Sequence, residues 1–335
     1  MKNQIKKLES LIEKANDILI IQPDNPDGDS LGSALALEQI FNNLGKDTKL
    51  YCGTTIPAYL KYAKGWSRVS NNFPNQFDLA FIVDTSSFSL LQKLTKEDIS
   101  KLNSKDVIVL DHHQVDSDLP FTHLMINQPL SSTGELIYLI AKELDLKLNL
   151  EASKMLTISI LSDSLGLTTE QTTPQTIRIF GDLVENGVQP FELDKLRKEY
   201  NQKSLEITKF KGILLSRIQT YLDNKIALII IPYDEIKKYS PEYNPSILVL
   251  DDMRLINGNI ISIALKIYED HKITAKIRTN YGYPIANIVA QEFGGGGHRY
   301  AAGFKTYDYS DLNLLINDLT TKIKHIIENL DAKNL

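Results

Sequence analysis

The chain has 335 residues, more than the roughly 250–300 that a single hydrophobic core usually serves, so we expect two domains. Hydrophobic residues make up 42% of it and charged residues 24%, a balance that excludes disordered and fibrous proteins. A net charge of -5, from 37 basic and 42 acidic residues, argues against a protein that coats duplex DNA by neutralising its phosphates.

The single cysteine, Cys52, excludes an intrachain disulfide and any all-cysteine metal cluster. We therefore expect a reducing, cytoplasmic location, and any metal site would have to use Asp, Glu and His side chains. No apolar stretch approaches the roughly 20 residues of a membrane helix, and the first ten residues lack a signal-peptide pattern. The sequence thus predicts a soluble protein without a membrane partner.

Three short apolar runs in the first half, at 18–21, 79–83 and 107–110, are typical of buried parallel strands. Helical patterns occupy 30–44, 134–144, 151–161 and 176–185. Strands that alternate with helices indicate an α/β domain, a mostly parallel sheet with flanking helices, which we place at residues 1–190.

Residues 191–218 are charge-rich and contain no glycine or proline before Gly212, which predicts one connecting helix. Residues 219–335 read as a smaller α+β domain. Its expected strands are 225–231, 261–268 and 272–278, and its expected helices are 246–255, 285–293 and 310–330.

Acidic and imidazole side chains follow the predicted strands of the first domain. Asp27 and Asp29 flank a glycine after the first strand, Asp84 ends the second, and Asp111, His112 and His113 end the third. A further acid, Asp163, ends the helix predicted at 151–161. Taken singly, such acids are also common in turns and helix caps. Taken together, they would meet at one edge, because parallel strands present their carboxyl ends on the same side of a sheet.

A set of carboxylates with one or two imidazoles suits Mn²⁺ or Mg²⁺ better than structural Zn²⁺. Two such ions, about 3.5–4 Å apart, can activate a nucleophile and stabilise the attacking and leaving oxygens of an in-line displacement. Phosphoester hydrolysis is the chemistry that this set predicts.

In the second domain, Gly294, Gly295, Gly296 and Gly297 precede His298 and Arg299. Backbone N–H groups without a Cβ beside them can bind a phosphate, although a flexible loop is the alternative. Arg278, at the end of a predicted strand, is a second candidate phosphate ligand. A surface arginine in water is the alternative there.

The ordered motifs resemble those of the DHH phosphoesterase family. They are Asn25-Pro26-Asp27-Gly28-Asp29-Ser30-Leu31-Gly32-Ser33, Val83-Asp84, Asp111-His112-His113, Ser162-Asp163 and Gly294 to Gly303, which ends in Ala301-Ala302-Gly303. Within the family the chain is similar to the compact bacterial nanoRNases and phosphoadenosine-phosphate phosphatases. The resemblance implies a DHH domain followed by a DHH-associated, substrate-binding domain.

The resemblance also implies roles for the site residues. Asp29, Asp84, His112 and Asp163 would hold one manganese ion, and Asp27 and Asp84 would share a second; Mg²⁺ and Co²⁺ are the alternative ions. His113 would contact the scissile phosphate, and we assign it to catalysis together with Asp111. Arg278, Gly295, Gly296, Gly297, His298 and Arg299 would bind the substrate.

The sequence departs from the family pattern at Pro23, where a metal-binding histidine usually stands. Proline has no side-chain donor, so either Asp24 or Gln22 supplies an oxygen instead, or the first metal binds weakly with water in that position.

The leading hypothesis is a Mn²⁺-dependent phosphodiesterase that cleaves short single-stranded RNA or dinucleotides, and 3′-phosphoadenosine 5′-phosphate, with no stable duplex DNA partner. The first alternative is a signalling phosphodiesterase for cyclic or linear dinucleotides. The second is a nucleotide-binding protein that Pro23 has impaired in catalysis. A homodimer is compatible with the sequence, because symmetric dimers are the commonest oligomers of soluble proteins.

Overall fold

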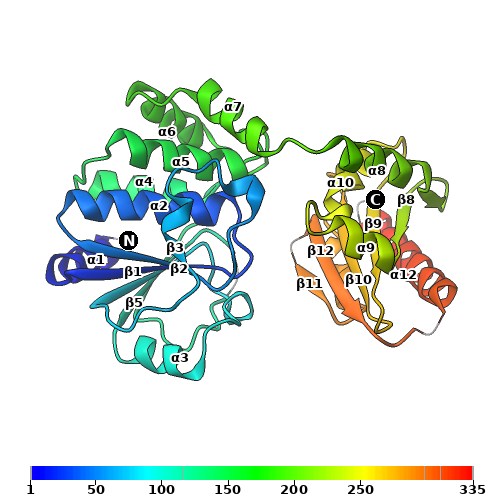
Figure 1. Ribbon diagram of the computed structural model, residues 1–335, viewed down its shortest axis with the longest axis horizontal. Coiled ribbons are helices and arrows are strands. Elements are labelled where there is room, and N and C mark those ends of the chain that lie inside the picture. The colour runs from blue at the N-terminus through cyan, green and yellow to red at the C-terminus, as the bar shows by residue number, and fades with distance from the viewer. Residues whose placement is uncertain (1, 115, 298, 310, 334–335) are drawn as a thin grey trace. The chain divides into compact units, whose positions relative to one another are not determined.

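The computed structural model describes residues 2–114, 116–297, 299–309 and 311–333. The chain divides into two compact units, Met1–Gln202 and Lys203–Leu335. Figure 1 shows a sheet with helices in each unit. No helix in these described ranges is long and apolar enough to cross a membrane.

The N-terminal unit is built on a six-stranded parallel sheet in the order β3-β2-β1-β4-β5-β6. The strands are β1 (Asp17–Gln22), β2 (Asp47–Cys52), β3 (Val69–Ser70), β4 (Leu79–Val83), β5 (Asp106–Asp111) and β6 (Leu124–Asn127). The helices are α1 (Lys2–Lys14), α2 (Gly28–Asn43), α3 (Lys96–Asn103), α4 (Thr133–Glu143), α5 (Leu150–Asp163), α6 (Pro174–Glu185) and α7 (Pro190–Tyr200), with short 3₁₀ turns η1 (Ala58–Leu60), η2 (Trp66–Arg68) and η3 (Phe88–Leu90). The expected α/β domain is confirmed.

Both faces of this sheet are buried. Ile18 and Ile20 of β1 point into a core shared with α1, α2, α4 and α5, whereas Leu19 and Ile21 point into a second core shared with α3. Figure 1 shows α2, α4 and α5 over one face and α3 over the other. Burial on both faces explains why the central strands read as unbroken apolar runs.

The segment expected to form one connecting helix instead forms two. Helix α7 ends at Tyr200, and α8 (Leu205–Ser216) begins after Ser204, whose side chain accepts a hydrogen bond from Ile207 N at 3.1 Å. A serine N-cap satisfies a donor at the start of a new helix, so it favours a break at this point. Helix α7 belongs to the first unit and α8 to the second.

The C-terminal unit has a mixed sheet in the order β11-β12-β10-β9-β8-β7; among its described strand pairs, β8–β9 is parallel and the others are antiparallel. Its strands are β7 (Gln219–Tyr221), β8 (Ile226–Ile231), β9 (Ile261–Ile267), β10 (Ile273–Thr279), β11 (Gly296–Gly297) and β12 (Ala301–Thr306). Its other helices are α9 (Tyr233–Tyr239), α10 (Pro245–Arg254), α11 (Ala286–Gln291) and α12 (Leu312–Lys333).

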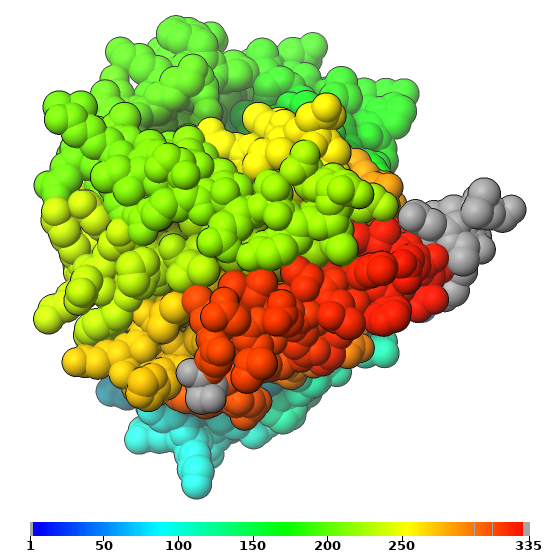
Figure 2. Space-filling model, turned by 90° about the vertical axis from the view of Figure 1, so that its right-hand side faces the viewer, coloured from blue at the N-terminus to red at the C-terminus, as the bar shows by residue number. Residues whose placement is uncertain are grey.

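Helices cover both faces of this second sheet, so the expected α+β unit is also confirmed. One core joins the sheet to α11 and α12, and the other joins it to α8, α9 and α10. In Figure 2 the red segment, α12, lies on the surface of this unit.

Candidate metal centre

The candidate ligands of the N-terminal unit follow three adjacent strands. Asp27 and Asp29 follow β1, Asp84 follows β4, and His112 and His113 follow β5. The strand order reverses its direction of growth between β1 and β4. Open parallel sheets bind ligands beyond the carboxyl ends of their strands at such a switch point, because the neighbouring loops diverge to opposite faces there.

Helix α2 begins inside the first acidic motif. Asp27 is its N-cap: Oδ1 accepts a hydrogen bond from Ser30 N at 3.0 Å, and Ser30 Oγ accepts one from Asp27 N at 2.9 Å. This reciprocal pair is a capping box, which fixes the first turn of the helix. Asp29 lies within that turn and is fully buried, whereas Asp27 remains exposed.

Both carboxylate oxygens of Asp29 accept hydrogen bonds. Thr133 N donates to Oδ2 at 2.8 Å, and Gly134 N donates to Oδ1 at 3.2 Å. The hydroxyls of Ser33 and Ser159 also donate to Oδ1. Because Thr133 and Gly134 start α4, the positive ends of two helices, α2 and α4, face this one carboxylate.

Asp84 is held in an unusual backbone conformation. Its φ is 61°, in the left-handed region that residues other than glycine rarely adopt. The residue is 6% exposed, and its Oδ1 accepts a hydrogen bond from Thr133 Oγ1 at 3.1 Å. Backbone strain of this kind costs about 1–3 kcal/mol and is concentrated at functional sites, which marks Asp84 as a functional candidate.

His112 lies at the centre of the carboxylates. Its Nε2 is 3.2 Å from Asp163 Oδ2 and 3.5 Å from both Asp29 Oδ2 and Asp84 Oδ1. Its Nδ1 lies 3.1 Å from the carbonyl oxygen of Leu130, to which it can donate. Among the described residues Nε2 has no hydrogen-bond partner. A histidine that donates through Nδ1 presents the Nε2 lone pair to a cation.

His113 is oriented by Asp111, the last residue of β5. Its Nδ1 is 2.7 Å from Asp111 Oδ1, and that oxygen also accepts the backbone N–H groups of His112 and His113. Burial opposes the charge of Asp111, but the hydrogen bond and charge of His113 outweigh it and lower the pKa of Asp111. The geometry makes Asp111 a positioning residue for His113.

The cluster is electrostatically costly without a cation. Burial, together with the charges of Asp163 and Asp27, raises the pKa of Asp29 to about 6. Burial and the charges of Asp29 and Asp27 raise the pKa of Asp84 well above its usual range. Burial alone would lower the pKa of His112, yet the surrounding carboxylates raise it to about 12. The shifts of the two acids and of His112 thus reflect burial together with closely spaced carboxylates.

Close helix packing brings these side chains together. A Cβ on Gly28 would lie 2.4 Å from Ser162 Oγ, and one on Gly32 would lie 2.6 Å from Met155 O. A Cβ on Gly134 would likewise meet Ser159 Oγ at 2.0 Å. Glycine at these positions lets α2 and α4 approach α5, which carries Asp163 at its end.

The predicted metal ligands largely converge. Two groups have ligand atoms within 4.8 Å of one another: Asp29, His112 and Asp163 in one, and Asp84, His112 and His113 in the other. Asp27 belongs to neither group, although its charge raises the pKa of both Asp29 and Asp84. The unpaired, buried Nε2 of His112 and the oxygen-rich donor set fit a divalent cation such as Mn²⁺ or Mg²⁺.

The two side chains beside Pro23 differ in their surroundings. Asp24 Oδ2 accepts a hydrogen bond from Lys93 N at 2.9 Å, so this carboxylate is engaged in the loop. Gln22 is fully buried, and within the described ranges neither polar atom of its amide has a hydrogen-bond partner. Gln22 thus retains an unused oxygen donor at the end of β1.

In the C-terminal unit, Arg278 stands in a row of cations. Lys276 lies two residues before it, on the same face of β10. On the neighbouring strand β9, Ser262 pairs with Arg278 and Ala264 pairs with Lys276. Lys266 lies two residues beyond Ala264 and therefore on the same face of the sheet. Burial lowers the pKa of all three cations, that of Lys266 to about 8. Partly buried cations that repel one another favour an anion. The two lysines were not predicted, although the alternation along β10 could have indicated Lys276.

The glycine run serves the packing of this unit. Gly296 and Gly297 pair with Gly303 and Ala302 of β12, and a Cβ on Gly295 would lie 2.3 Å from Gly303 O. Gly295 N donates to Ala290 O at 2.8 Å, so this N–H is already used. The carbonyl of Arg299 accepts from Ala286 N at 2.8 Å. The predicted ligand His298 lies outside the described residues.

Some known proteins are similar to this chain in sequence, and some solved structures are similar to it in fold. The oligoribonuclease and PAP phosphatase NrnA of Bacillus subtilis, described as bifunctional, is 24% identical over 97% of this chain and 99% of its own. An exopolyphosphatase-related protein from Bacteroides fragilis is 21% identical with a TM-score of 0.84, over 98% of this chain and 96% of that chain. RecJ of Thermus thermophilus in complex with Mn²⁺ has a TM-score of 0.55 at 14% identity, over 98% of this chain and 54% of RecJ.

Residues 17–162 match the DHH family, N-terminal domain. This segment runs from the first residue of β1 to the residue before Asp163, and it contains Asp27, Asp29, Asp84 and the Asp111-His112-His113 motif. The chain therefore carries a segment, from β1 to the end of α5, that is similar to the DHH family, N-terminal domain.

Proposed function

We propose that this protein is a metal-dependent phosphoesterase that hydrolyses short single-stranded oligoribonucleotides to mononucleotides, and also removes phosphate from 3′-phosphoadenosine 5′-phosphate. The observation that carries the proposal is His112, whose Nε2 lies without a hydrogen-bond partner among the described residues and 3.2–3.5 Å from three carboxylates. The near full-length similarity to NrnA of Bacillus subtilis supports the substrate class.

We assign two Mn²⁺ ions to the centre, with Mg²⁺ or Co²⁺ as substitutes. Asp29, Asp84, His112 and Asp163 would hold one ion, and Asp84 and Asp27 the other. Gln22, whose buried amide has no hydrogen-bond partner among the described residues, is a better replacement for the missing histidine ligand than Asp24. When bound, such ions supply Lewis-acid activation of the phosphoryl group and of the attacking water.

The chain's own residues then position the substrate and move the proton. Asp111 holds His113 through Nδ1 at 2.7 Å, so Nε2 is the nitrogen that we assign to the scissile phosphate. There it can donate a hydrogen bond to a phosphoryl oxygen or protonate the leaving oxygen. In the C-terminal unit we assign a second phosphate of the substrate to Arg278, the run Gly295–Gly297, His298 and Arg299, and we add Lys266 and Lys276.

Product analysis tests this function. Metal-stripped protein is incubated with a linear diribonucleotide or cyclic diadenylate, with Mn²⁺ or EDTA. We expect mononucleotides from the linear substrate with Mn²⁺ alone, and a loss of at least about 100-fold in Asp84→Ala, because that carboxylate serves both ions. Preference for the cyclic substrate would favour the signalling role instead. Binding of the linear substrate without cleavage in Mn²⁺, Mg²⁺ and Co²⁺ would indicate a nucleotide-binding protein.

We also place the protein in the cytoplasm, because a chain with one buried cysteine suits a reducing compartment.

A further inference from the structure

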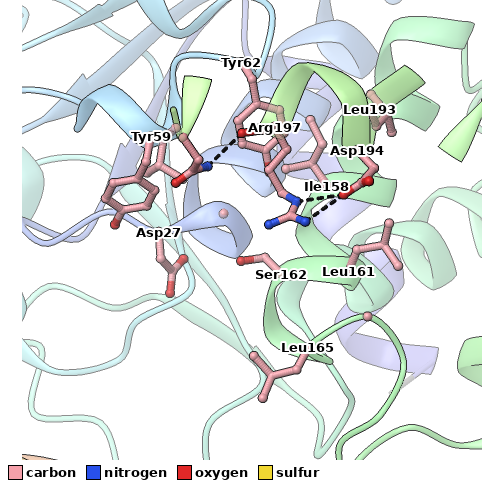
Figure 3. Close-up of a pocket in the computed structure, with 14 residues that line it drawn as sticks. Asp27, Tyr59, Tyr62, Ile158, Leu161, Ser162, Leu165, Leu193, Asp194 and Arg197 are labelled. Carbon is pink, nitrogen blue, oxygen red and sulfur yellow. Dashed lines mark hydrogen bonds and ion pairs between the residues drawn. The ribbon is translucent and has the colours of Figure 1, made fainter. Parts of the chain in front are cut away.

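A cavity of about 530 Å³ opens beside the metal centre, within the N-terminal unit. Asp27 and Gly28 line one side of it, and Ser162, the neighbour of Asp163, lines another (Figure 3). Pockets for small organic ligands usually measure about 300–1,000 Å³. The cavity is therefore large enough for a nucleoside next to the residues that we assign to the reacting phosphate.

Aromatic and aliphatic side chains form much of the wall. Tyr59 and Tyr62 come from the η1 region, Leu161 and Leu165 from the end of α5 and its following loop, and Leu193 from α7. Figure 3 shows Tyr59 above Asp27 and Leu165 at the opposite margin. Tyr59 is 39% exposed and Leu165 is 62% exposed, so apolar surface is accessible here. Aromatic faces of this kind stack on nucleobases without regard to sequence.

The charged residues of the cavity lining are two acids, Asp27 and Asp194, and one cation, Arg197. Arg197 donates to Asp194 Oδ1 through Nε at 3.2 Å and through Nη2 at 2.7 Å. Figure 3 shows its guanidinium held by Asp194 and pointing toward Ser162. A cation already paired with a carboxylate, in a cavity that a second acid, Asp27, also lines, disfavours a phosphate. Its planar face can still pack against a base.

The backbone at the margin of the cavity, at residues 165–167, is strained. Leu165 and Leu167 have φ of 48° and 69°, on either side of Gly166 at 74°. Left-handed backbone at a leucine costs free energy, and such strain is concentrated at ligand clamps and active sites. Backbone hydrogen bonds from Leu165 N to Ser162 O and from Gly166 N to Leu161 O hold the turn. The turn places the exposed Leu165 at the margin of the cavity.

We propose that this cavity is a nucleoside subsite: it binds one base and ribose of the substrate whose scissile phosphate lies at the metal centre, with Tyr59 as the stacking residue. The inference rests on the proposed function and extends it, because it adds a base-recognition site in the catalytic unit. It makes the enzyme selective for nucleotides over simple phosphoesters without selecting among bases.

The test compares kcat/KM for a linear diribonucleotide with kcat/KM for an abasic analogue that carries tetrahydrofuran spacers. Loss of the stacking face in Tyr59→Ala should lower the ratio of the two values about 10-fold, within the range measured for base stacking. Tyr59→Phe keeps a ring and should restore most of the ratio. Tyr200→Ala, a control at a 48% exposed tyrosine of α7 outside the cavity lining, should keep the wild-type ratio.

Binding of AMP in EDTA, measured by calorimetry, separates this inference from the proposed function. If the wild type cleaves no dinucleotide but AMP binding weakens about 10-fold in Tyr59→Ala and not in Tyr200→Ala, the subsite stands and the proposed reaction fails. If the dinucleotide is cleaved but Tyr59→Ala matches the wild type in both the ratio and AMP binding, the subsite is overturned and the reaction stands.

Discussion

Asp29 and Asp84 show what it costs to bury single acids at the candidate metal centre. Both carboxylates are buried next to other acids, which would normally prevent them from ionising together. Hydrogen bonds from Thr133 and Gly134 at the start of α4 offset part of that cost. His112 supplies one positive charge when protonated, but the same nitrogen must lose its proton to bind a metal.

The first prediction concerns the pH dependence of folding in EDTA. The pKa of Asp29 is raised from 3.8 to about 6 and that of Asp84 is also raised, so the folded state binds protons more tightly than the unfolded chain. The contribution of Asp29 to stability is therefore complete below pH 4 and is lost as pH rises through about 6, and that of Asp84 has the same sign. His112 acts with the same sign above its ordinary pKa of 6.5.

Urea unfolding at pH 5 and pH 8 tests the sign of this pH dependence. In EDTA the free energy of unfolding should fall more from pH 5 to pH 8 in the wild type than in Asp29→Asn, which removes one buried acid. Excess Mn²⁺ should stabilise the wild type more at pH 8, because deprotonated ligands bind the metal. Equal pH slopes for the two proteins in EDTA would contradict the electrostatic account of this cluster.

At the scale of elements, the junction of α2, α4 and α5 determines whether the carboxylates meet. Asp29 comes from the first turn of α2, its backbone donors from the first turn of α4, and Asp163 from the last residue of α5. Gly28, Gly32 and Gly134 leave no room for a Cβ at the contacts between these helices. A small separation of α2 from α5 would therefore move Asp29 away from Asp163 and His112.

The second prediction is that Gly28→Ala weakens both folding and metal binding. The new methyl group would lie 2.4 Å from Ser162 Oγ and 2.6 Å from its Cβ, so α2 and α5 must separate. We expect a loss of about 1–3 kcal/mol in the free energy of unfolding, typical of overpacking, and weaker Mn²⁺ binding by calorimetry.

Gly181→Ala is the matched control for this change. Gly181 lies in α6 and is exposed, and a Cβ added to it would meet no atom within 4 Å outside the backbone of its own helix. Alanine should stabilise that helix by roughly 0.5–1 kcal/mol through its higher helix propensity. If both variants changed stability and Mn²⁺ affinity alike, the packing argument for Gly28 would be wrong.

At the scale of the whole molecule, each unit has its own hydrophobic cores. Those of the N-terminal unit use residues between Ile5 and Leu193, and those of the C-terminal unit use residues between Ile207 and Ile327. The candidate metal ligands all lie in the first unit, and the row of Lys266, Lys276 and Arg278 lies in the second. The proposed metal binding and the proposed binding of a second phosphate thus belong to separately packed units.

The third prediction is that residues 1–202 fold alone and bind Mn²⁺ with an affinity within about 3-fold of the whole chain, because a unit with its own core can fold independently. Circular dichroism and calorimetry would check this, with Asp84→Ala in the same fragment as the control. The fragment should cleave a dinucleotide with a higher KM, since it lacks the cations of the second unit. An unfolded fragment would show that the first unit depends on the second.

The sequence by itself determined the central strands and the residues at their ends. Runs such as 79–83 are apolar throughout because both faces of a central parallel strand are buried, and this property is local. Edge strands such as β6, with burial that alternates, and the amphipathic α1, which buries Ile5, Leu8 and Ile12, were not predicted. Asp84 and His112 were identifiable because each directly follows a central strand, β4 or β5.

Only the tertiary structure decided how those residues are held and what lies beside them. Asp29 takes its backbone donors from residues 104 and 105 positions away, and the hydroxyl of Ser159 from 130 positions away. Tyr59 and Arg197 line one cavity although they are far apart in the chain. Periodicity reports the burial of a local segment, whereas desolvation, hydrogen bonding and cavity walls depend on contacts between distant segments, and only the packed chain brings these together.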